Sequence, residues 1–340
     1  MRHTKKIQSG FSLIEIMVAL VISLFLLGGI IQVFIGNKVT YRFSDASARV
    51  QENGRFSLDI IASDIRMAGF MGCYSLQDDD NLSDDNPYLF NQLNFTAGAI
   101  FDFVDEPSVD ATNTAGSWTA ANADTLTIRG AQPSQNTITT NLSPLTNPVV
   151  VGANNTFQTG DIAMITNCFS ANIFQITSVS TDRTTLGHTA AAGTPGNANA
   201  SFSTSIPVSI YNANSASVFS LQEVTYSIGT SASGSGEPAL FRSVNGIDQE
   251  LIEGIENFQL LFGVDTDGDG SANQYLESDN AAVNLAQVTA IRLWLVVRSD
   301  QDFIVDEIQS YSINGNNITP TDRRFRQVYS ATIALRSKSG

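Results

Sequence analysis

The hydrophobic pattern of the chain changes once, from a long helical pattern at the amino-terminal end to short β-type runs afterwards. Residues 11–35 form an apolar run of 25 residues in which Glu15 is the only charged side chain. About 20 apolar residues suffice to cross a bilayer as a helix. The sequence therefore predicts a transmembrane helix over 11–35, with one carboxylate inside it.

The helical pattern continues beyond residue 35. Apolar or small side chains recur at roughly helical spacing at Phe43, Ala46, Val50, Ser57, Ile61, Ile65 and Ala68. Charged residues of both signs fill the intervening positions, and no proline precedes Pro87. We expect one nearly continuous helix from about residue 11 to 67, roughly 85 Å long, whose amphipathic half (36–70) packs on a globular head. The alternative is a simple membrane anchor followed by a separate amphipathic helix.

The rest of the chain, residues 71–340, is typical of a β-rich head domain. Short runs with strand-forming residues are separated by Gly, Asn, Pro and Ser. They predict strands at 99–104, 125–129, 137–140, 149–151, 161–166, 173–179, 206–211, 218–228, 240–242, 258–264, 288–297 and 325–335. Residues 251–256 are predicted to form a helical turn. The fold class is therefore α+β, a long amino-terminal helix packed on a β-rich head.

A basic leader, residues 1–10, precedes the apolar run. It carries Arg2, Lys5 and Lys6, which the positive-inside rule keeps in the cytoplasm, so the head faces the periplasm or the exterior. An ordinary secretory signal is cut after its apolar region at small residues. Residues 35–38 offer no such site.

Composition and charge narrow the classes of partner. The formal net charge is −15, and a surface without clustered Lys and Arg disfavours binding to phosphate backbones. Direct nucleic-acid binding is therefore not expected. The only cysteines are Cys73 and Cys168, outside any CxxC motif. In an exported protein we expect them to form one disulfide; the alternative is two unrelated buried thiols.

Catalytic chemistry finds little support in the sequence. His188 is the only histidine outside the leader, in a Gly- and Thr-flanked segment that predicts a surface loop. The chain lacks a G-x-S-x-G, an H-E-x-x-H, a P-loop and a G-x-G-x-x-G motif. We expect no enzymatic activity and no required cofactor.

One acidic segment is a candidate Ca²⁺ loop. Its oxygen donors alternate in sequence at Asp265, Asp267, Asp269, Ser271 and Asn273. The first six residues fit the D-x-D-x-D-G start of an EF-hand loop. The twelfth position, however, is Leu276, with Glu277 one place late. The alternative is an Asp/Gly-rich hairpin turn without a metal.

Gly10-Phe11-Ser12-Leu13-Ile14-Glu15, behind a basic leader and ahead of an apolar run, resembles the class III signal of type IV pilins and related pseudopilins. The resemblance implies cleavage between Gly10 and Phe11 by a prepilin peptidase and N-methylation of Phe11. It also implies that Glu15 aids registration of the subunit during assembly, because a carboxylate in an apolar environment needs a partner such as a terminal ammonium.

Segments of the head extend the resemblance to the PilW-type minor pilins. They are residues 63–73, 123–130, 160–168, 253–265 and 326–330. The resemblance implies a type IV pilin-like fold, and it supports pairing of Cys73 with Cys168, which lie in two of these segments.

The function that this resemblance implies is structural. With other minor pilins, the chain would prime pilus assembly and sit at the tip of a fibre of major pilin, presenting a larger adhesin there. Its other partners would be the prepilin peptidase and the inner-membrane assembly platform. Before assembly the subunit would span the inner membrane once, with a periplasmic head; afterwards it would lie at the pilus tip on the cell surface.

Two other functions remain open. A minor pseudopilin of a type II secretion system shares the signal and the helix. A membrane-anchored periplasmic binding module or enzyme would keep its leader uncut.

Overall fold

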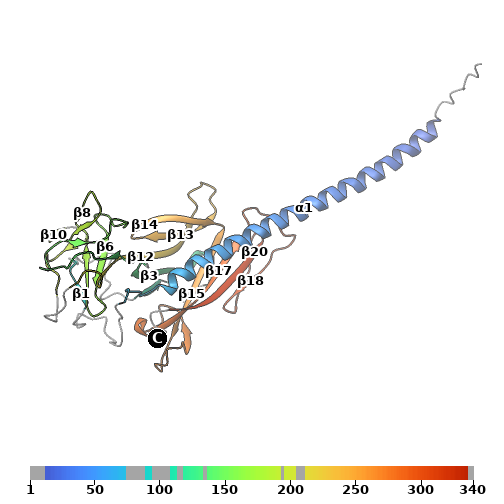
Figure 1. The fold of residues 1–340 in the computed structure, drawn as a ribbon. Coiled ribbons are helices and arrows are strands. Elements are labelled where there is room, and N and C mark those ends of the chain that lie inside the picture. Colours follow the sequence, from blue (N-terminus) through green and yellow to red (C-terminus); the bar gives the residue numbers. More distant parts are fainter. Residues whose placement is uncertain are drawn as a thin grey trace, which may run out of the picture.

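In the computed structural model, the described residues are 12–73, 89–93, 108–112, 118–132, 136–192, 195–203 and 211–335. A single long helix, α1, leaves a β-rich head at one end, and the head consists of two lobes (Figure 1). The predicted α+β class is confirmed. Gly10, Phe11, the predicted strand at 99–104 and most of the one at 206–211 lie outside the described residues.

Helix α1 runs without interruption over Leu13–Arg66, 54 residues and about 80 Å. It continues through Gly28 and Gly29, so the two separate helices of the alternative interpretation do not occur. Its first buried side chain is Ala46, and every described residue before Arg42 is exposed. The helix is capped at its carboxy-terminal end by Met67, whose N–H donates to the carbonyl of Asp64.

The lobe next to α1, here called the proximal lobe, is built from two antiparallel groups of strands. One consists of β2 (Val109–Thr112), β3 (Thr125–Ala131), the second part of β12 (Ser217–Thr230), β13 (Pro238–Val244) and β14 (Ile247–Glu253). The other is a sheet in the order β16 (Gln274–Leu276), β15 (Ile255–Val264), β17 (Val288–Arg298) and β20 (Arg326–Ala334). Short elements complete the lobe at η1 (Ala120–Asn122), η2 (Leu285–Gln287), β18 (Tyr311–Ile313) and β19 (Asn316–Ile318).

One hydrophobic core joins α1 to both groups of strands. It contains Val50, Ile61 and Ile65 from the helix, Leu126, Tyr226 and Leu240 from the first group, and Phe258, Leu293 and Ile333 from the second. The buried stripe on α1 is close to the predicted one. Burial of these side chains removes apolar surface from water, which is the main contribution that holds the helix on the head.

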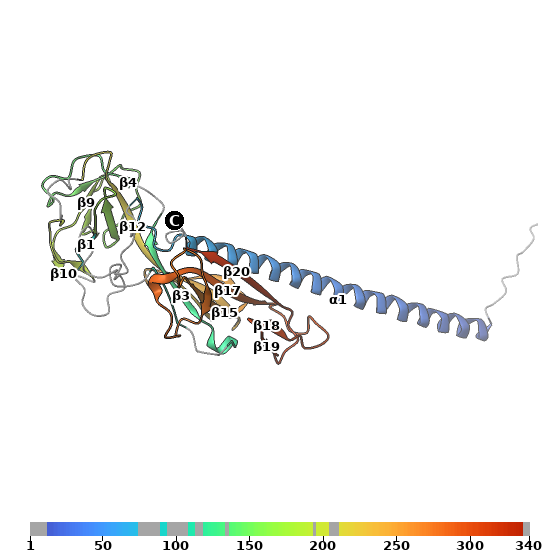
Figure 2. The ribbon, with the colours of Figure 1, turned by 90° about the horizontal axis from the view of Figure 1, so that it is seen from below.

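The second lobe, here called the distal lobe, consists of the described residues of 136–203, residues 211–216, β1 and the start of β12. Its strands are β1 (Leu89–Asn91), β4 (Asn136–Thr137), β5 (Val149–Val150), β6 (Ile162–Thr166), β7 (Ala171–Gln175), β8 (Ser178–Val179), β9 (Thr185–Gly187), β10 (Ala191–Ala192) and β11 (Gly196–Asn197). It has its own core around Phe157, Phe174, Leu186, Phe202 and Tyr211. It lies beyond the carboxy-terminal end of α1 (Figures 1 and 2).

Strand β12 connects the two lobes. Residues 217–220 pair with β6 in the distal lobe, and residues 221–230 pair with β3 or β13 in the proximal lobe. Within the head, predicted as residues 71–340, each lobe has a hydrophobic core of its own, and the two lobes share one 14-residue strand.

The predicted helical turn at 251–256 is wrong. Residues up to Glu253 belong to β14, and β15 begins at Ile255. Gly254 lies between them with φ 92°, a left-handed conformation that glycine adopts readily. Because the chain turns sharply at Gly254, β15 follows β14 directly. A short apolar run such as this one cannot be distinguished from a helical turn by its sequence pattern alone.

Candidate functional site

The start of α1 is closed by a capping box. The Ser12 hydroxyl accepts from the Glu15 N–H at 3.3 Å, and the Ser12 N–H donates to Glu15 Oε2 at 2.9 Å. Glu15 thus has a partner within its own first turn, which the sequence interpretation did not anticipate. The signal for it was present, since Ser-x-x-Glu before an apolar run is the capping-box pattern. The described residues begin at Ser12, so the cleavage site itself lies outside them.

The apolar half of α1 is exposed along its whole length. The helix is long and apolar enough to cross a membrane, and none of the apolar window is buried against the head. A Cβ added at Gly28, Gly29 or Gly36 would meet no atom within 4 Å. This half needs a cover of lipid or of other helices, because soluble proteins rarely leave such apolar areas in water.

The second half of α1 is fixed to the proximal lobe by close packing. A Cβ built on Gly54 would overlap the ring of Tyr329 on β20, so a side chain there would require that ring to shift. The Tyr329 hydroxyl donates to the carbonyl of Val50 at 3.3 Å, and Asn53 Nδ2 donates to the carbonyl of Glu253 at 3.0 Å. The helix is thereby held in one register against β20.

A polar cluster fixes the carboxy-terminal part of α1. Asp64 Oδ2 accepts from the Tyr226 hydroxyl at 2.6 Å and from Arg242 Nε at 2.9 Å. Burial, with the adjacent Asp64 charge, raises the pKa of Tyr226 well above its usual range, so the phenol stays a donor. Tyr226 is fully buried and lies on β12, the strand that both lobes share.

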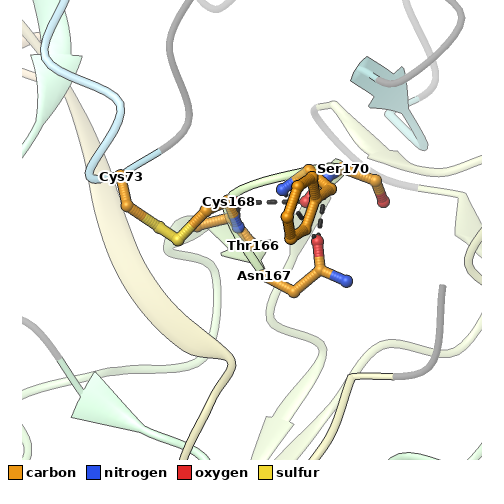
Figure 3. The surroundings of a disulfide bond; sticks show 6 residues. Cys73, Thr166, Asn167, Cys168 and Ser170 are labelled. Carbon is orange, nitrogen blue, oxygen red and sulfur yellow. Dashed lines mark hydrogen bonds between the residues drawn. A yellow bond between two sulfur atoms is a disulfide. The ribbon is translucent and has the colours of Figure 1, made fainter.

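The two cysteines are joined, as predicted. Cys73 follows the end of α1 by seven residues, and Cys168 lies in the turn between β6 and β7 of the distal lobe, with Cα atoms 4.9 Å apart (Figure 3). Cys168 has φ 71°, and its N–H donates to Thr166 Oγ1 at 3.0 Å. Asn167 Oδ1 closes the same turn by accepting from the N–H groups of Phe169 and Ser170. The disulfide therefore links the end of the helix to the distal lobe.

The acidic loop between β15 and β16 brings together three carboxylates. One oxygen from each of Asp265, Asp267 and Asp269 lies within 4.8 Å of the others. Asp265 Oδ2 accepts from the Gly270 N–H at 2.7 Å, and Oδ1 accepts from the Gly268 N–H at 2.8 Å. These contacts tighten the loop around a buried Asp265, while Asp267 and Asp269 stay exposed.

The other predicted metal ligands of this loop, Ser271 and Asn273, form hydrogen bonds within the loop. Asn273 Oδ1 accepts from the Thr266 N–H at 2.7 Å, and Asn273 Nδ2 donates to Asp267 Oδ2 at 3.1 Å, so its amide closes the turn. The Ser271 N–H donates to Asp269 Oδ1. Glu277 is not part of the three-carboxylate group; it lines a neighbouring surface hollow of about 600 Å³. Carboxylate oxygens are ligands that a hard cation such as Ca²⁺ prefers. The three carboxylates would supply part of the six to eight oxygen ligands that Ca²⁺ binds.

His188 does not lie on the surface, contrary to the sequence interpretation. It is 3% exposed, its ring stacks on Phe202 at 4.0 Å, and Nε2 donates to the carbonyl of Asn147 at 2.7 Å. Burial lowers the pKa of His188, which favours the neutral ring. Its contacts are those of a core side chain in the distal lobe.

Comparison with known families agrees with the resemblance inferred from the sequence. Residues 225–337 match the family model described as type IV pilus-assembly protein W, and residues 5–31 match the prokaryotic N-terminal methylation motif. The first match covers most of the proximal lobe, and the second covers the leader and the start of α1. No curated protein and no solved structure matches the chain.

Proposed function

We propose that this chain, which matches the type IV pilus-assembly protein W family and carries an N-terminal methylation motif, is a minor pilin that primes pilus assembly and sits at the pilus tip. The observation that carries the proposal is the division of α1. Its second half is docked on the head, whereas its first half, Leu13 to Ile35, is apolar and fully exposed. An exposed apolar helix of this kind can be held in the lipid bilayer before assembly and can pack against the helices of other pilins afterwards.

The position of the distal lobe supports a place at the tip. The lobe lies past the carboxy-terminal end of α1, opposite the end from which the apolar half leaves the head (Figures 1 and 2). In a fibre whose helices bundle at the centre, a further head would have to occupy the space beyond that end. A subunit with this lobe therefore suits a terminal position, where it would contact other minor pilins and the major pilin below and a larger adhesin above.

Processing prepares the subunit for assembly. A prepilin peptidase would cut between Gly10 and Phe11 and methylate the new amino terminus. The Glu15 carboxylate, now bonded to the Ser12 N–H, would register the subunit against a neighbour's terminal ammonium as it leaves the inner membrane at the assembly platform. Before this step the subunit would span the inner membrane once with its head in the periplasm, and afterwards it would lie at the cell surface.

Three measurements test this function. Intact mass of the protein from membranes should show loss of residues 1–10 and one added methyl group; an uncut leader would favour an anchored periplasmic binding module or enzyme. A deletion strain should lose surface pili and keep protein secretion. The opposite phenotype would identify a pseudopilin of a type II secretion system. Sheared pili should contain the chain at far below the level of major pilin and together with other minor pilins.

Glu15 provides a separate test of the assembly step. Glu15→Gln keeps a polar side chain that can still cap α1, but removes the charge that would pair with an ammonium. We expect normal cleavage and normal head folding, with loss of incorporation into pili. Ser12→Ala, which removes the hydroxyl contact but not the charge, is the matched control and should assemble.

The loop Asp265–Asn273 is a second proposal, a Ca²⁺ site on the head. The close approach of Asp265, Asp267 and Asp269 supports it, because a cation would offset the repulsion of three carboxylates. Millimolar Ca²⁺ should then raise the melting temperature of the purified chain, and Asp267→Asn with Asp269→Asn should abolish the increase. No shift with Ca²⁺ would identify the loop as a metal-free turn.

A further inference from the structure

The exposed apolar side chains beyond the first half of α1 are unevenly distributed. Among the described residues, the large ones after residue 35 are Val39, Tyr41, Phe43, Phe56, Phe169, Ile247, Phe303 and Ile308. Four of these, Val39, Phe43, Phe303 and Ile308, lie where α1 enters the head and are here called the collar. Val39 and Phe43 line one side of a groove of about 530 Å³, and Ile308 lines the other with Ile304 and Val305.

The collar has a defined structure, because the loop that carries Phe303 and Ile308 is held by several hydrogen bonds. The N–H groups of Ile304 and Val305 both donate to the carbonyl of Arg323 at 3.1 Å. Arg42 Nη2, on the helix, donates to Gln301 Oε1 at 3.2 Å. Arg324 Nη1 holds the start of the loop by donating to the carbonyls of Ser299 and Asp300.

Phe303 is presented to solvent at a conformational cost. It has φ 58°, a left-handed conformation that is unfavourable for a non-glycine residue. The residue is 62% exposed, with the Arg323 guanidinium 4.2 Å from the centroid of its ring. An apolar side chain held outward in this way needs a cover that the described residues do not supply.

The position of the collar along α1, relative to the membrane, indicates what covers its apolar side chains. Val39 lies four residues beyond Ile35, the end of the apolar run, which is about 6 Å along the helix. The headgroup layer extends roughly 5–8 Å beyond the hydrocarbon on each side of a bilayer. When the apolar run spans the membrane, Val39 is therefore at headgroup depth, and Phe43, about 12 Å beyond Ile35, lies just outside that layer. Aromatic side chains are enriched at that depth.

We propose that the collar inserts into the headgroup layer of the membrane that holds α1, so that the stored subunit is seated on the bilayer through Phe303 and Ile308 as well as through its helix. This inference rests on the proposed membrane storage of the subunit. Charged residues of both signs lie in or next to the collar segments: Lys38, Arg42 and Arg323 are basic, and Asp300, Asp302, Asp306 and Glu307 are acidic. Their near balance fits zwitterionic lipid, and apolar insertion provides the attraction.

The experiment uses the full chain in nanodiscs of phosphatidylcholine with brominated acyl chains, which quench nearby tryptophan. Phe303→Trp and Ile308→Trp probe the collar, and Phe34→Trp reports insertion of the helix. Phe169→Trp is the matched control, since Phe169 is 78% exposed but lies in the distal lobe. The unsubstituted chain, with Trp118 and Trp294, gives the background. Melting curves verify that each variant folds, and Ile308→Trp carries the test if Phe303→Trp does not fold.

We expect the probes at 34, 303 and 308 to lose most of their fluorescence relative to unbrominated discs, and the probe at 169 to lose none. Quenching at 34 but not at 303 and 308 would overturn the collar proposal while membrane storage stands. No quenching at 34 would refute membrane storage and the collar proposal with it. A response at 303 only when another pilin is added would assign the groove to a neighbouring helix, and would likewise overturn the proposal.

Discussion

The ring of Tyr329 lies directly over Gly54, so that a strand near the end of the chain occupies the place of a side chain on α1. The Tyr329 hydroxyl donates to the carbonyl of Val50, one helical turn earlier. This contact makes the absence of a Cβ a requirement of the helix–head interface, although glycine is unfavourable in a helix interior by about 1 kcal/mol.

Gly54→Ala should therefore destabilise the chain. Overpacking a close interface typically costs about 1–3 kcal/mol, which exceeds the gain in helix propensity. We expect a lower melting temperature in detergent. Gly36→Ala is the matched control, because a Cβ there would meet no atom within 4 Å and should raise helix stability slightly. Equal melting of Gly54→Ala and the parent chain would show that Tyr329 moves aside freely.

Loss of the disulfide should loosen the distal lobe from α1. In the chain-entropy model, a link across about 100 residues contributes up to about 4.7 kcal/mol, and the two cysteines are 95 residues apart. Cys73→Ser with Cys168→Ser should lower the melting temperature and admit protease to residues 67–73, between α1 and the disulfide. Reduction of the parent chain should give the same result. If neither treatment changes melting or cleavage, the noncovalent contacts of β12 suffice to hold the distal lobe.

Asp124 should make stability fall as pH rises towards neutrality. It is 1% exposed, its Oδ2 accepts from the Leu260 N–H at 2.8 Å, and its Oδ1 has no hydrogen-bond partner among the described residues. Burial raises the pKa of Asp124 to about 7, and the charges of Glu277 and Asp279 add to this. An unfolded Asp has a pKa of about 3.9.

The favourable contribution of protonated Asp124 is therefore complete below about pH 4 and is lost as pH rises through about 7. Asp124→Asn, which can still accept from Leu260, should melt with a weaker pH dependence between pH 5 and 8 and be more stable than the parent at pH 8. Unchanged pH dependence in the variant would show that the folded carboxyl ionises normally.

His188 should act in the opposite direction. Burial lowers its folded pKa below the unfolded value of about 6.5. Its neutral ring supports the distal lobe above that pH, and this support is lost as pH falls from about 6.5 through the folded pKa. His188→Gln, which can still donate to Asn147, should lessen acid destabilisation of the distal lobe. Histidine proton NMR of the parent gives the folded pKa directly, and a value at or above 6.5 would contradict the prediction.

The sequence was sufficient for the features that depend on local pattern. Helical spacing and the absence of proline predicted α1 to within two residues at either end. Three of the longest strands, β12, β17 and β20, coincide with predicted runs, whereas β15 begins three residues before its predicted run, within the predicted helical turn. The cysteine pair was also predicted, because an exported chain with two cysteines has one possible pairing.

What the sequence did not give depends on contacts between distant residues. Tyr226 and Arg242 contact Asp64 although both are more than 160 positions away in the sequence. No pattern in the sequence near Asp64 predicts these contacts. From the sequence alone, Gly54 is only a residue that disfavours the helix. Its role in packing is evident only once Tyr329 on β20 lies over it. His188 has threonine and glycine neighbours that suggest a surface loop, whereas its burial depends on Phe202, which only the folded distal lobe brings onto its ring.

The position of the disulfide has a mechanical consequence. A load applied to the distal lobe and resisted at the amino-terminal end of α1 can pass through the hydrogen-bonded pairing of β12 or through the apolar cluster that includes Met71 and Met164. It can also pass through the bond from Cys168 to Cys73, seven residues from the end of the helix. The disulfide route is covalent throughout and bypasses both sheets of the proximal lobe. A subunit that carries tension at the end of a fibre would transmit it along that route, so the sheets need not unzip for the head to stay attached to its stem.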